Sequence, residues 1–284
     1  MKIGITEASF SQLKEERYKK IYDSGFKFID FDMSNTETSL YQCSSDEFIK
    51  HLKAERELAE SAGLYINQVH GPWRWEPRDA TEEDRAERME KMKKSIFGTS
   101  ILGCENWVIH PIMPFGIYDK GTENEKITWD LNIKFMKELT LEAKKYGVTV
   151  CVENMPMPEF SIASPDEILK LVGIIDDENF KVCFDTGHAA ICEGSKIGDA
   201  VRRTGEALRV LHVHDNDGVS DLHRMPFYGI IDWEDFNEAL KNVGYSGVFS
   251  LEAGPAKRLP AEIFDDVAKI MHKCALKILD KGGK

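Results

Sequence analysis

Six apolar, β-rich stretches of this chain end in His, Asp or Glu. They are YINQVH, WVIH, VTVCVE, KVCFD, LHVH and FSLE, and their last residues are His70, His110, Glu153, Asp185, His214 and Glu252. Imidazole and carboxylate groups are side chains that bind divalent metal ions through nitrogen and oxygen. Buried strands that all finish in such groups indicate a fold that gathers many strand ends at one mouth, with a metal site there.

Strand and helix patterns alternate along the whole length of the chain. Eight strands are expected, at residues 2–6, 26–33, 64–70, 106–111, 148–154, 181–185, 209–214 and 248–253. Apolar residues recur every three or four positions between several of them, which predicts helices over 46–62, 81–101, 129–146 and 233–243. We therefore expect an α/β fold, a single (β/α)8 TIM-barrel domain over residues 1–284 with its metal site at the C-terminal mouth. A doubly wound open sheet is the alternative.

Helix-boundary signals agree with these elements. The glycines that follow a helical pattern just ahead of a strand, where a left-handed helix end favours glycine, are Gly25, Gly63, Gly103, Gly147 and Gly244. Another helix is predicted to start with Ser164 as N-cap, Pro165 in the first turn and Glu167 as the capping-box partner. Every ligand-type residue then falls at the C-terminal end of a strand, where TIM barrels carry their active sites.

Composition and charge limit the partners of this chain. A formal net charge of −12 at pH 7 and the lack of a basic run argue against a broad nucleic-acid surface. No stretch reaches the roughly 18 apolar residues of a membrane span, so we expect a cytoplasmic protein without a membrane partner. No glycine-rich phosphate loop is present, and no nucleotide cofactor is expected. The six cysteines form no CxxC pair and are expected to be reduced.

The strand-end carboxylates require a compensating charge. Glu153, Asp185 and Glu252 could each be the salt-bridged end of a strand if taken singly. Gathered in one mouth, such like charges repel strongly unless a cation neutralises them. The set therefore predicts a divalent metal ion, for which Mn²⁺, Mg²⁺ and Zn²⁺ are the candidates.

Histidines extend the set of candidate ligands. Five of the eight lie at or just beyond strand ends, namely His70, His110, His188, His214 and His223. Asp221 stands two residues before His223, in the loop that follows the seventh strand. His212 shares a strand face with His214, and we expect it one layer deeper, as a hydrogen-bonded core residue. His51 and His272 belong to helices and are expected at the surface.

Together these motifs carry a family resemblance that covers nearly the whole chain. The motifs are H-G-P, V-I-H-P, V-E-N, F-D-T-G-H, H-V-H-D-N, D-x-H followed by G-x-x-D-W, and L-E. The chain resembles the xylose isomerase-like TIM-barrel superfamily, which joins sugar phosphate isomerases and epimerases with apurinic endonucleases of the endonuclease IV type. The pattern is specific for the superfamily and much less so for one reaction within it.

Two ligand sets follow from this resemblance. In the ketose 3-epimerases of the superfamily, one Mn²⁺- or Mg²⁺-type ion is held by four side chains, which we match to Glu153, Asp185, His214 and Glu252. The two glutamates of those enzymes also move the proton. In the endonuclease branch nine residues hold three zinc ions, and the matching positions here are His70, His110, Glu153, Asp185, His188, His214, Asp221, His223 and Glu252.

The preferred interpretation is a metal-dependent isomerase or epimerase of a small ketose, keto-polyol or sugar phosphate. The reaction would transfer a proton through an enediolate, with Glu153 and Glu252 as catalytic residues. A small carbohydrate is then the expected partner, and the chain could form a homo-oligomer. The residues expected to contact the substrate are His188, Trp73, Trp75, Phe115 and Arg224, although Arg224 could equally form a surface salt bridge.

The alternative is an endonuclease IV-type apurinic endonuclease, a three-zinc phosphodiesterase. Trp73, Arg74 and Trp75 form an aromatic and basic segment directly after His70, and such a segment could wedge into an opened base stack. The same segment could instead cover a sugar ring with an indole face, which we favour.

Overall fold

The computed structural model describes residues 1–73 and 79–280 of the chain. Arg74 and Trp75, which the sequence places in the loop after His70, lie outside the described residues. No helix among the described residues is both long enough and apolar enough to cross a membrane.

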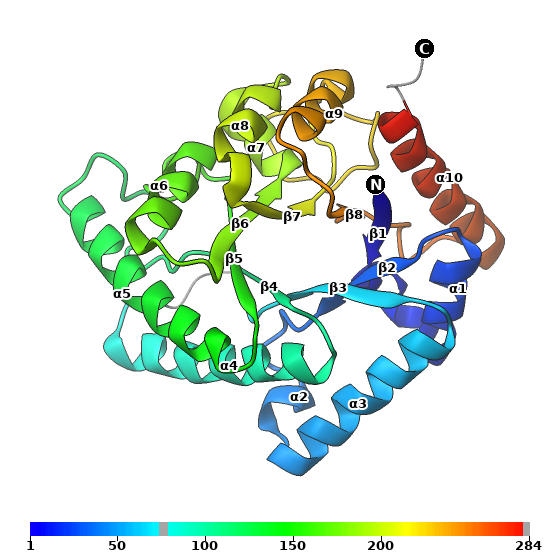
Figure 1. Cartoon of the computed structure of the whole chain (residues 1–284), viewed down its shortest axis with the longest axis horizontal. Helices are drawn as coiled ribbons and strands as arrows, with labels where there is room; N and C mark the ends of the chain where they lie inside the picture. Colours follow the sequence, from blue (N-terminus) through cyan, green and yellow to red (C-terminus); the bar gives the residue numbers. More distant parts are fainter. Residues whose placement is uncertain (74–78, 281–284) are drawn as a thin grey trace.

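Eight parallel strands form the wall of a nearly closed barrel (Figure 1). The strands are β1 (Lys2–Thr6), β2 (Phe28–Asp32), β3 (Tyr65–His70), β4 (Asn106–Ile109), β5 (Thr149–Glu153), β6 (Phe180–Asp185), β7 (Leu208–His212) and β8 (Val248–Leu251). Their order in the sheet is β7-β6-β5-β4-β3-β2-β1-β8, so strands that are consecutive in sequence are also neighbours in space. This arrangement confirms the predicted TIM barrel.

The barrel closes between β7 and β8 through a short contact just beyond the strand ends. Val213 and Leu251 form an isolated parallel bridge. The Val213 N–H donates to the Ser250 carbonyl at 2.8 Å, and the Glu252 N–H donates to the Val213 carbonyl at 3.0 Å. The seam between β7 and β8 therefore has one bridged residue pair, whereas every other pair of neighbouring strands has at least two.

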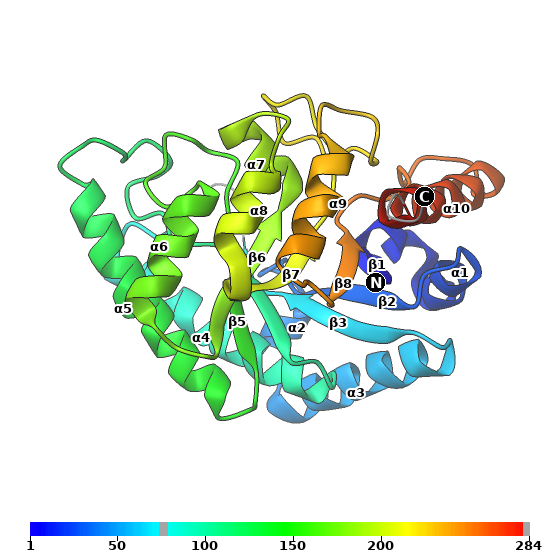
Figure 2. The same cartoon turned by 45° about the horizontal axis from the view of Figure 1, so that its top comes forward.

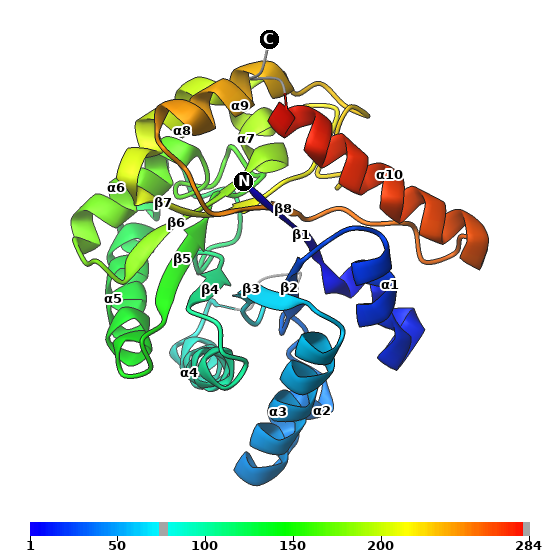
Figure 3. The same cartoon turned by 45° about the vertical axis from the view of Figure 1, so that its right-hand side comes forward.

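Helices surround the strands on the outside (Figure 2). They are η1 (Glu7–Glu16), α1 (Arg17–Asp23), α2 (Ser39–Gln42), α3 (Ser45–Ser61), α4 (Glu82–Ile101), α5 (Glu125–Lys144), α6 (Pro165–Ile175), α7 (Thr186–Glu193), α8 (Gly198–Thr204), η2 (Gly205–Ala207), α9 (Trp233–Asn242) and α10 (Ala261–Asp280). Figure 3 shows α10 on the outer side of β1, with which it is in contact, so the last helix covers the strand that begins the barrel.

Local capping explains where the helices begin. The predicted cap at Ser164 is confirmed, because its side chain accepts from the Glu167 N–H and Glu167 bonds back to the Ser164 N–H. Ser44 and Thr81 form equivalent capping boxes at the starts of α3 and α4. One expected boundary is wrong, since α5 begins at Glu125, four residues ahead of the predicted start at 129.

The barrel interior holds an apolar and a polar set of side chains. Val108, Cys151, Cys183 and Val210 form a small buried cluster. Asp30, Gln68 and Ser250 form a polar layer, in which Asp30 Oδ2 accepts hydrogen bonds from Ser250 Oγ at 2.6 Å and Gln68 Nε2 at 3.0 Å. Gln68 Nε2 also donates to the Leu211 carbonyl of β7 at 3.3 Å. This layer links β2, β3, β7 and β8 directly beneath the mouth. All six cysteines are free, as expected.

Candidate metal centre

The strand-end side chains converge at the C-terminal mouth of the barrel. Four of them, Glu153, Asp185, His212 and Glu252, place one ligand atom each within 4.8 Å of the others. His212 Nδ1 lies 2.8 Å from Glu153 Oε1 and 3.2 Å from Glu252 Oε2. Three carboxylates and one imidazole in this space form a donor set suited to a divalent metal ion. We call these four residues the first group.

The first group contains His212 where the sequence predicted His214. The pairing of β6 with β7 shifts register between Val182 and Cys183, and the Cα partner of Asp185 is His212. His212 therefore stands level with Asp185 instead of one layer deeper, which corrects the expected depth of His212, while His214, the predicted ligand, keeps its Nε2 3.0 Å from Asp185 Oδ2. The register shift is a property of the folded strand pair and leaves no signal in a sequence pattern.

His70, His110 and Glu153 form a second group at the same mouth. His110 Nε2 lies 3.0 Å from Glu153 Oε2, and His70 Nε2 lies 3.7 Å from the same oxygen. Because Glu153 Oε1 faces His212, the two oxygens of one carboxylate face two different groups. A carboxylate in this position can bridge two metal sites.

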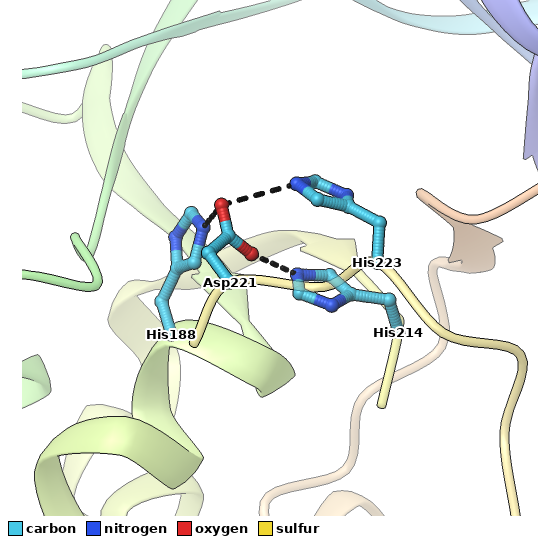
Figure 4. Close-up of side chains that lie close together, drawn as sticks. All are labelled: His188, His214, Asp221 and His223. Atoms are coloured by element: carbon cyan, nitrogen blue, oxygen red, sulfur yellow. Dashed lines mark hydrogen bonds and ion pairs between the residues drawn. The ribbon is translucent and has the colours of Figure 1, made fainter. Parts of the chain in front are cut away.

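The third group contains His188, His214, Asp221 and His223, and Figure 4 shows the three imidazoles arranged around the Asp221 carboxylate. His188 Nε2 lies 3.3 Å from Asp221 Oδ2, His223 Nε2 lies 3.2 Å from the same oxygen, and His214 Nε2 lies 3.7 Å from Asp221 Oδ1. The His214 and His223 rings stack with centroids 4.1 Å apart. Asp221 and His223, the predicted D-x-H pair, thus lie in one group with His188 and His214.

Hydrogen bonds to backbone carbonyls orient three of these imidazoles. Nδ1 of His188 bonds to the Asn154 carbonyl at 2.7 Å, Nδ1 of His223 to the Glu252 carbonyl at 2.8 Å, and Nδ1 of His70 to the Gly71 carbonyl at 2.9 Å. In each case Nε2 is left to face a carboxylate of the mouth. Metal-binding histidines are commonly oriented in this way, with the second ring nitrogen fixed by a carbonyl or carboxylate.

Several buried ligand atoms of the mouth make no hydrogen bond of good geometry within the described residues, and they include Asp185 Oδ2, His188 Nε2, His214 Nε2 and Glu252 Oε2. These atoms lie against ionisable neighbours instead, as His214 Nε2 does 3.0 Å from Asp185 Oδ2. Asp185 uses its other oxygen to cap α7, where Oδ1 accepts from the His188 N–H at 2.7 Å. Burying such atoms without a well-formed hydrogen bond is unfavourable unless a ligand completes their bonding. The residues present therefore fit a bound cation.

The loop after β7 is organised by one buried carboxylate. Asp215 Oδ2 accepts from the Trp233 indole at 3.2 Å and from the Phe227 N–H at 3.1 Å. The backbone of Asp215 also pairs with that of Arg224 in both directions at 2.8 Å. These bonds tie down the segment that carries Asp221 and His223, and His223 itself adopts a positive φ of 42°. A held, strained loop keeps its side chains in the mouth.

Electrostatics at the mouth keep the glutamates ionised. Burial alone would raise the pKa of Glu153, but the adjacent His212 and His110 outweigh it and hold the pKa well below its usual range. Burial and His212 oppose each other in the same way at Glu252, whose pKa is also lowered. Both carboxylates are therefore available as metal ligands or as proton acceptors near neutral pH.

The histidines of the mouth are held in different protonation states. Burial lowers the pKa of His110 to about 4, so its imidazole is neutral near pH 7. Burial opposes the charged form of His188 too, but Asp185 and Asp221 outweigh it and raise the pKa to about 10. The pKa of His223 is likewise raised to about 10, against its burial, by Asp221 and Glu252. A cation in the third group would take the place of these protons.

A cavity of about 470 Å³ opens over the mouth, and it is of the size that small-molecule sites have. Glu153, His212 and Glu252 line its metal-ligand side, together with His188. Trp73, a predicted substrate contact, also lines it, with its ring centroid 4.9 Å from that of His110. Glu153 and Glu252, both predicted from the sequence, thus line one cavity with room for a small ligand.

Other expected contacts lie away from this cavity. Phe115 is 43% exposed and is not among the lining residues. Arg224 is also outside the lining, and its guanidinium lies 3.8 Å from Asp217, which agrees with the alternative of a surface salt bridge. Trp75 lies outside the described residues. His51 is exposed as expected, whereas His272 is half-buried because its ring packs edge-on against Phe26.

Three charged residues that line the cavity were not predicted from the sequence. Asp30 is a buried residue of β2, Asp32 ends β2, and Lys257 stands in the loop after β8. The alternation of FIDFD indicates that Asp30 and Asp32 share one face of the strand, and this signal could have identified them. Lys257 belongs to a loop, and no local pattern shows where a loop lysine will point.

The family model described as a xylose isomerase-like TIM barrel matches residues 18–274, and the chain belongs to this family. The predicted family is thus confirmed. A D-psicose 3-epimerase from Ruminiclostridium cellulolyticum is 28% identical over 264 residues, which cover 89% of this chain and 83% of the relative.

Solved structures show the same fold. A D-tagatose 3-epimerase-like protein superposes with a TM-score of 0.75 at 25% identity and covers 99% of both chains. A protein crystallised with a bound zinc atom gives a TM-score of 0.74 at 18% identity over 100% of both chains. At that lower identity the second likeness concerns the fold alone.

Proposed function

We propose that this protein is a metal-dependent isomerase or epimerase of a small ketose, keto-polyol or sugar phosphate. The observation that carries the proposal is the position of Glu153 and Glu252 in one cavity, on either side of His212, with both carboxylates ionised. The D-psicose 3-epimerase relative supports sugar chemistry of this kind. Two carboxylates that face one small-ligand cavity can remove a proton on one side and return one on the other.

The first group is the proposed metal site. Glu153, Asp185, His212 and Glu252 would hold one Mn²⁺, Mg²⁺ or Zn²⁺ ion. A bound divalent ion polarises the substrate carbonyl and makes the neighbouring C–H more acidic. The second and third groups offer further ligands, so more than one ion per chain is possible on this donor set.

The protein side chains would divide the remaining work. Glu153 or Glu252 removes the proton from the carbon next to the carbonyl, and the other glutamate returns it, through an enediolate of the substrate. His188, whose Nδ1 is fixed by the Asn154 carbonyl, donates to a substrate oxygen through Nε2 if the third group is metal-free. Trp73 provides an apolar wall against the sugar carbons and excludes water.

Carbon-bound hydrogen exchange tests this proposal. The Mn²⁺-loaded protein is incubated in D₂O with a panel of ketoses, keto-polyols and ketose phosphates, and deuterium at the carbon next to the carbonyl is measured by mass spectrometry. We expect incorporation with at least one compound, and none after the metal is removed by a chelator. Failure of every compound with metal bound would count against proton-transfer chemistry.

A metal-dependent phosphodiesterase is the second candidate function. It is favoured by the three adjoining ligand groups, two of which share Glu153. The net charge of −12 opposes it, because binding a DNA backbone requires clustered basic side chains. We expect an abasic duplex oligonucleotide to remain intact at about 150 mM salt. Rapid incision that needs metal and is lost in Glu252→Gln would reverse the order of the two candidates.

A further inference from the structure

One end of the cavity lies between the first turn of η1, which directly follows β1, and the loop that follows β8. The residues that line this end are Thr6, Ala8, Ser9, Ala253, Gly254 and Lys257. Lys257 is the one lysine or arginine among the described residues that line the cavity. Ala253 and Gly254 directly follow Glu252, so this lysine-bearing end adjoins the first group.

The ammonium group of Lys257 has no carboxylate partner within the described parts of the chain. Its one hydrogen bond is to the neutral hydroxyl of Ser11, at 3.0 Å. An ammonium group has three N–H donors, so two of them remain available. Lys257 therefore presents an uncompensated positive charge at the cavity.

The start of η1 and the loop after β8 are in direct contact. A Cβ atom added at Gly254 would lie 2.1 Å from Ser9 Cβ, so only a residue without a side chain fits there. The neighbouring lining residues Ala8 and Ala253 are also small. The side chains at Ala8 and Ala253 are short, so the longer Lys257 side chain is the charged group that this part of the lining offers to a ligand.

We propose that this end of the cavity, with Lys257 as its cation, binds the phosphate monoester of a phosphorylated ketose. The proposal rests on the function proposed above and narrows its substrate class. The sugar carbonyl would face the first group while the phosphate faces Lys257. The ammonium group of a lysine binds phosphate through its positive charge. TIM barrels often have their phosphate-binding sites in the loops after their last two strands.

Equilibrium binding tests the proposal without turnover. Calorimetry on the metal-loaded full-length protein compares D-fructose 6-phosphate with D-fructose, and D-ribulose 5-phosphate with D-ribulose. We expect at least one phosphorylated sugar to bind about tenfold or more tightly than its partner sugar. Lys257→Met should remove that preference and leave the affinity for the free sugar unchanged. Arg258→Met is the matched control, because Arg258 is adjacent but does not line the cavity.

Three outcomes would overturn the proposal. They are equal affinities within both sugar pairs, a preference that survives in Lys257→Met, and an equal loss of preference in Arg258→Met. Ser11→Ala should keep the preference, since it removes a competing acceptor and no ligand contact. A tighter, Lys257-dependent affinity for an abasic oligonucleotide would assign this contact to nucleic acid and also overturn the proposal. Lack of deuterium exchange, by contrast, would count against the proposed isomerase chemistry and leave the phosphate subsite standing.

Discussion

At the scale of single residues, Glu153 holds the central place in the mouth. One of its oxygens faces His212 and the other faces His110, so it belongs to two ligand groups at once. Its side chain is almost fully buried, and Glu252 is the only other glutamate of the described residues in the first group. We therefore predict that these two carboxylates are needed for both metal binding and proton transfer.

Glutamine variants separate charge from shape. Glu153→Gln and Glu252→Gln keep an oxygen ligand but lose the titrating group, and general acid–base assistance is worth about 10²–10⁴-fold. We expect each variant to slow deuterium exchange into the substrate by at least about that factor. Glu57→Gln, on the exposed face of α3, should exchange at the wild-type rate. Full exchange in both active-site variants with metal bound would show that other residues carry the proton.

Gly187 controls the position of His214. A Cβ atom at Gly187 would lie 2.0 Å from His214 Cε1, so Gly187→Ala must displace the ring from the third group. We expect a loss of about 1–3 kcal/mol in the free energy of unfolding and fewer metal ions per chain. Gly173→Ala is the control, since no atom lies within 4 Å of its added Cβ. Urea unfolding measures the free energy of unfolding, and elemental analysis measures the metal ions per chain. Identical results for Gly187→Ala and Gly173→Ala would contradict the close packing of Gly187 against His214.

The sequence identified individual ligands better than their grouping. Glu153, Asp185 and Glu252 were predicted because each ends an apolar strand pattern, and the structure brings them together. The relative depth of His212 and His214 could not be predicted, because both lie on one strand face and the register shift in β6–β7 decides which stands level with Asp185. Tertiary register of this kind depends on strand pairing and not on local sequence.

At the scale of elements, the β7–β8 seam is the part of the barrel wall that carries His212 on one side and Glu252 on the other. The polar layer of Asp30, Gln68 and Ser250 lies beneath this seam and ties strands from both sides of it. Burial raises the pKa of Asp30 to about 7. The Asp30 carboxyl group links strands on both sides of the β7–β8 seam. Its ionisation would therefore place a buried charge in this polar layer and weaken the seam.

Asp30 makes stability depend on pH in a definite direction. The folded protein keeps a proton that the unfolded chain releases near the ordinary aspartate pKa of 3.8, so stability falls as pH rises from about 4 to 7. About three pH units at roughly 1.4 kcal/mol each give a loss of up to about 4 kcal/mol. Urea unfolding of metal-free protein should show that Asp30→Asn lacks this loss, whereas Asp130→Asn keeps it. Parallel curves for Asp30→Asn and wild type would contradict the assignment.

Strands were predicted more reliably than the segments between them. All eight were expected within a few residues of their observed positions, since buried apolar runs with strand-end signals are local features. The 3₁₀ helix η1 and the short helices α2 and α7 were not expected. α7 begins at Thr186 because the Asp185 side chain caps it. Asp185 was predicted only as the end of a strand, so its role as a helix N-cap was missed.

At the scale of the whole molecule, the barrel explains how distant residues form one site. Parallel strands that follow one another around the wall bring residues from 70 to 252 to a single mouth. The fold class and the family were predictable, because they depend on a pattern repeated along the chain. The substrate was not, because the cavity is completed by loop residues such as Trp73 and Lys257.

The central claim is that the first group holds a divalent metal ion. The most direct measurement is anomalous diffraction from crystals of protein purified without chelator, at wavelengths on either side of the manganese and zinc absorption edges. We predict an anomalous peak about 2.0–2.6 Å from one donor atom each of Glu153, Asp185, His212 and Glu252. A peak confined to the third group, or a crystal without a bound metal from a preparation that exchanges substrate protons, would contradict it.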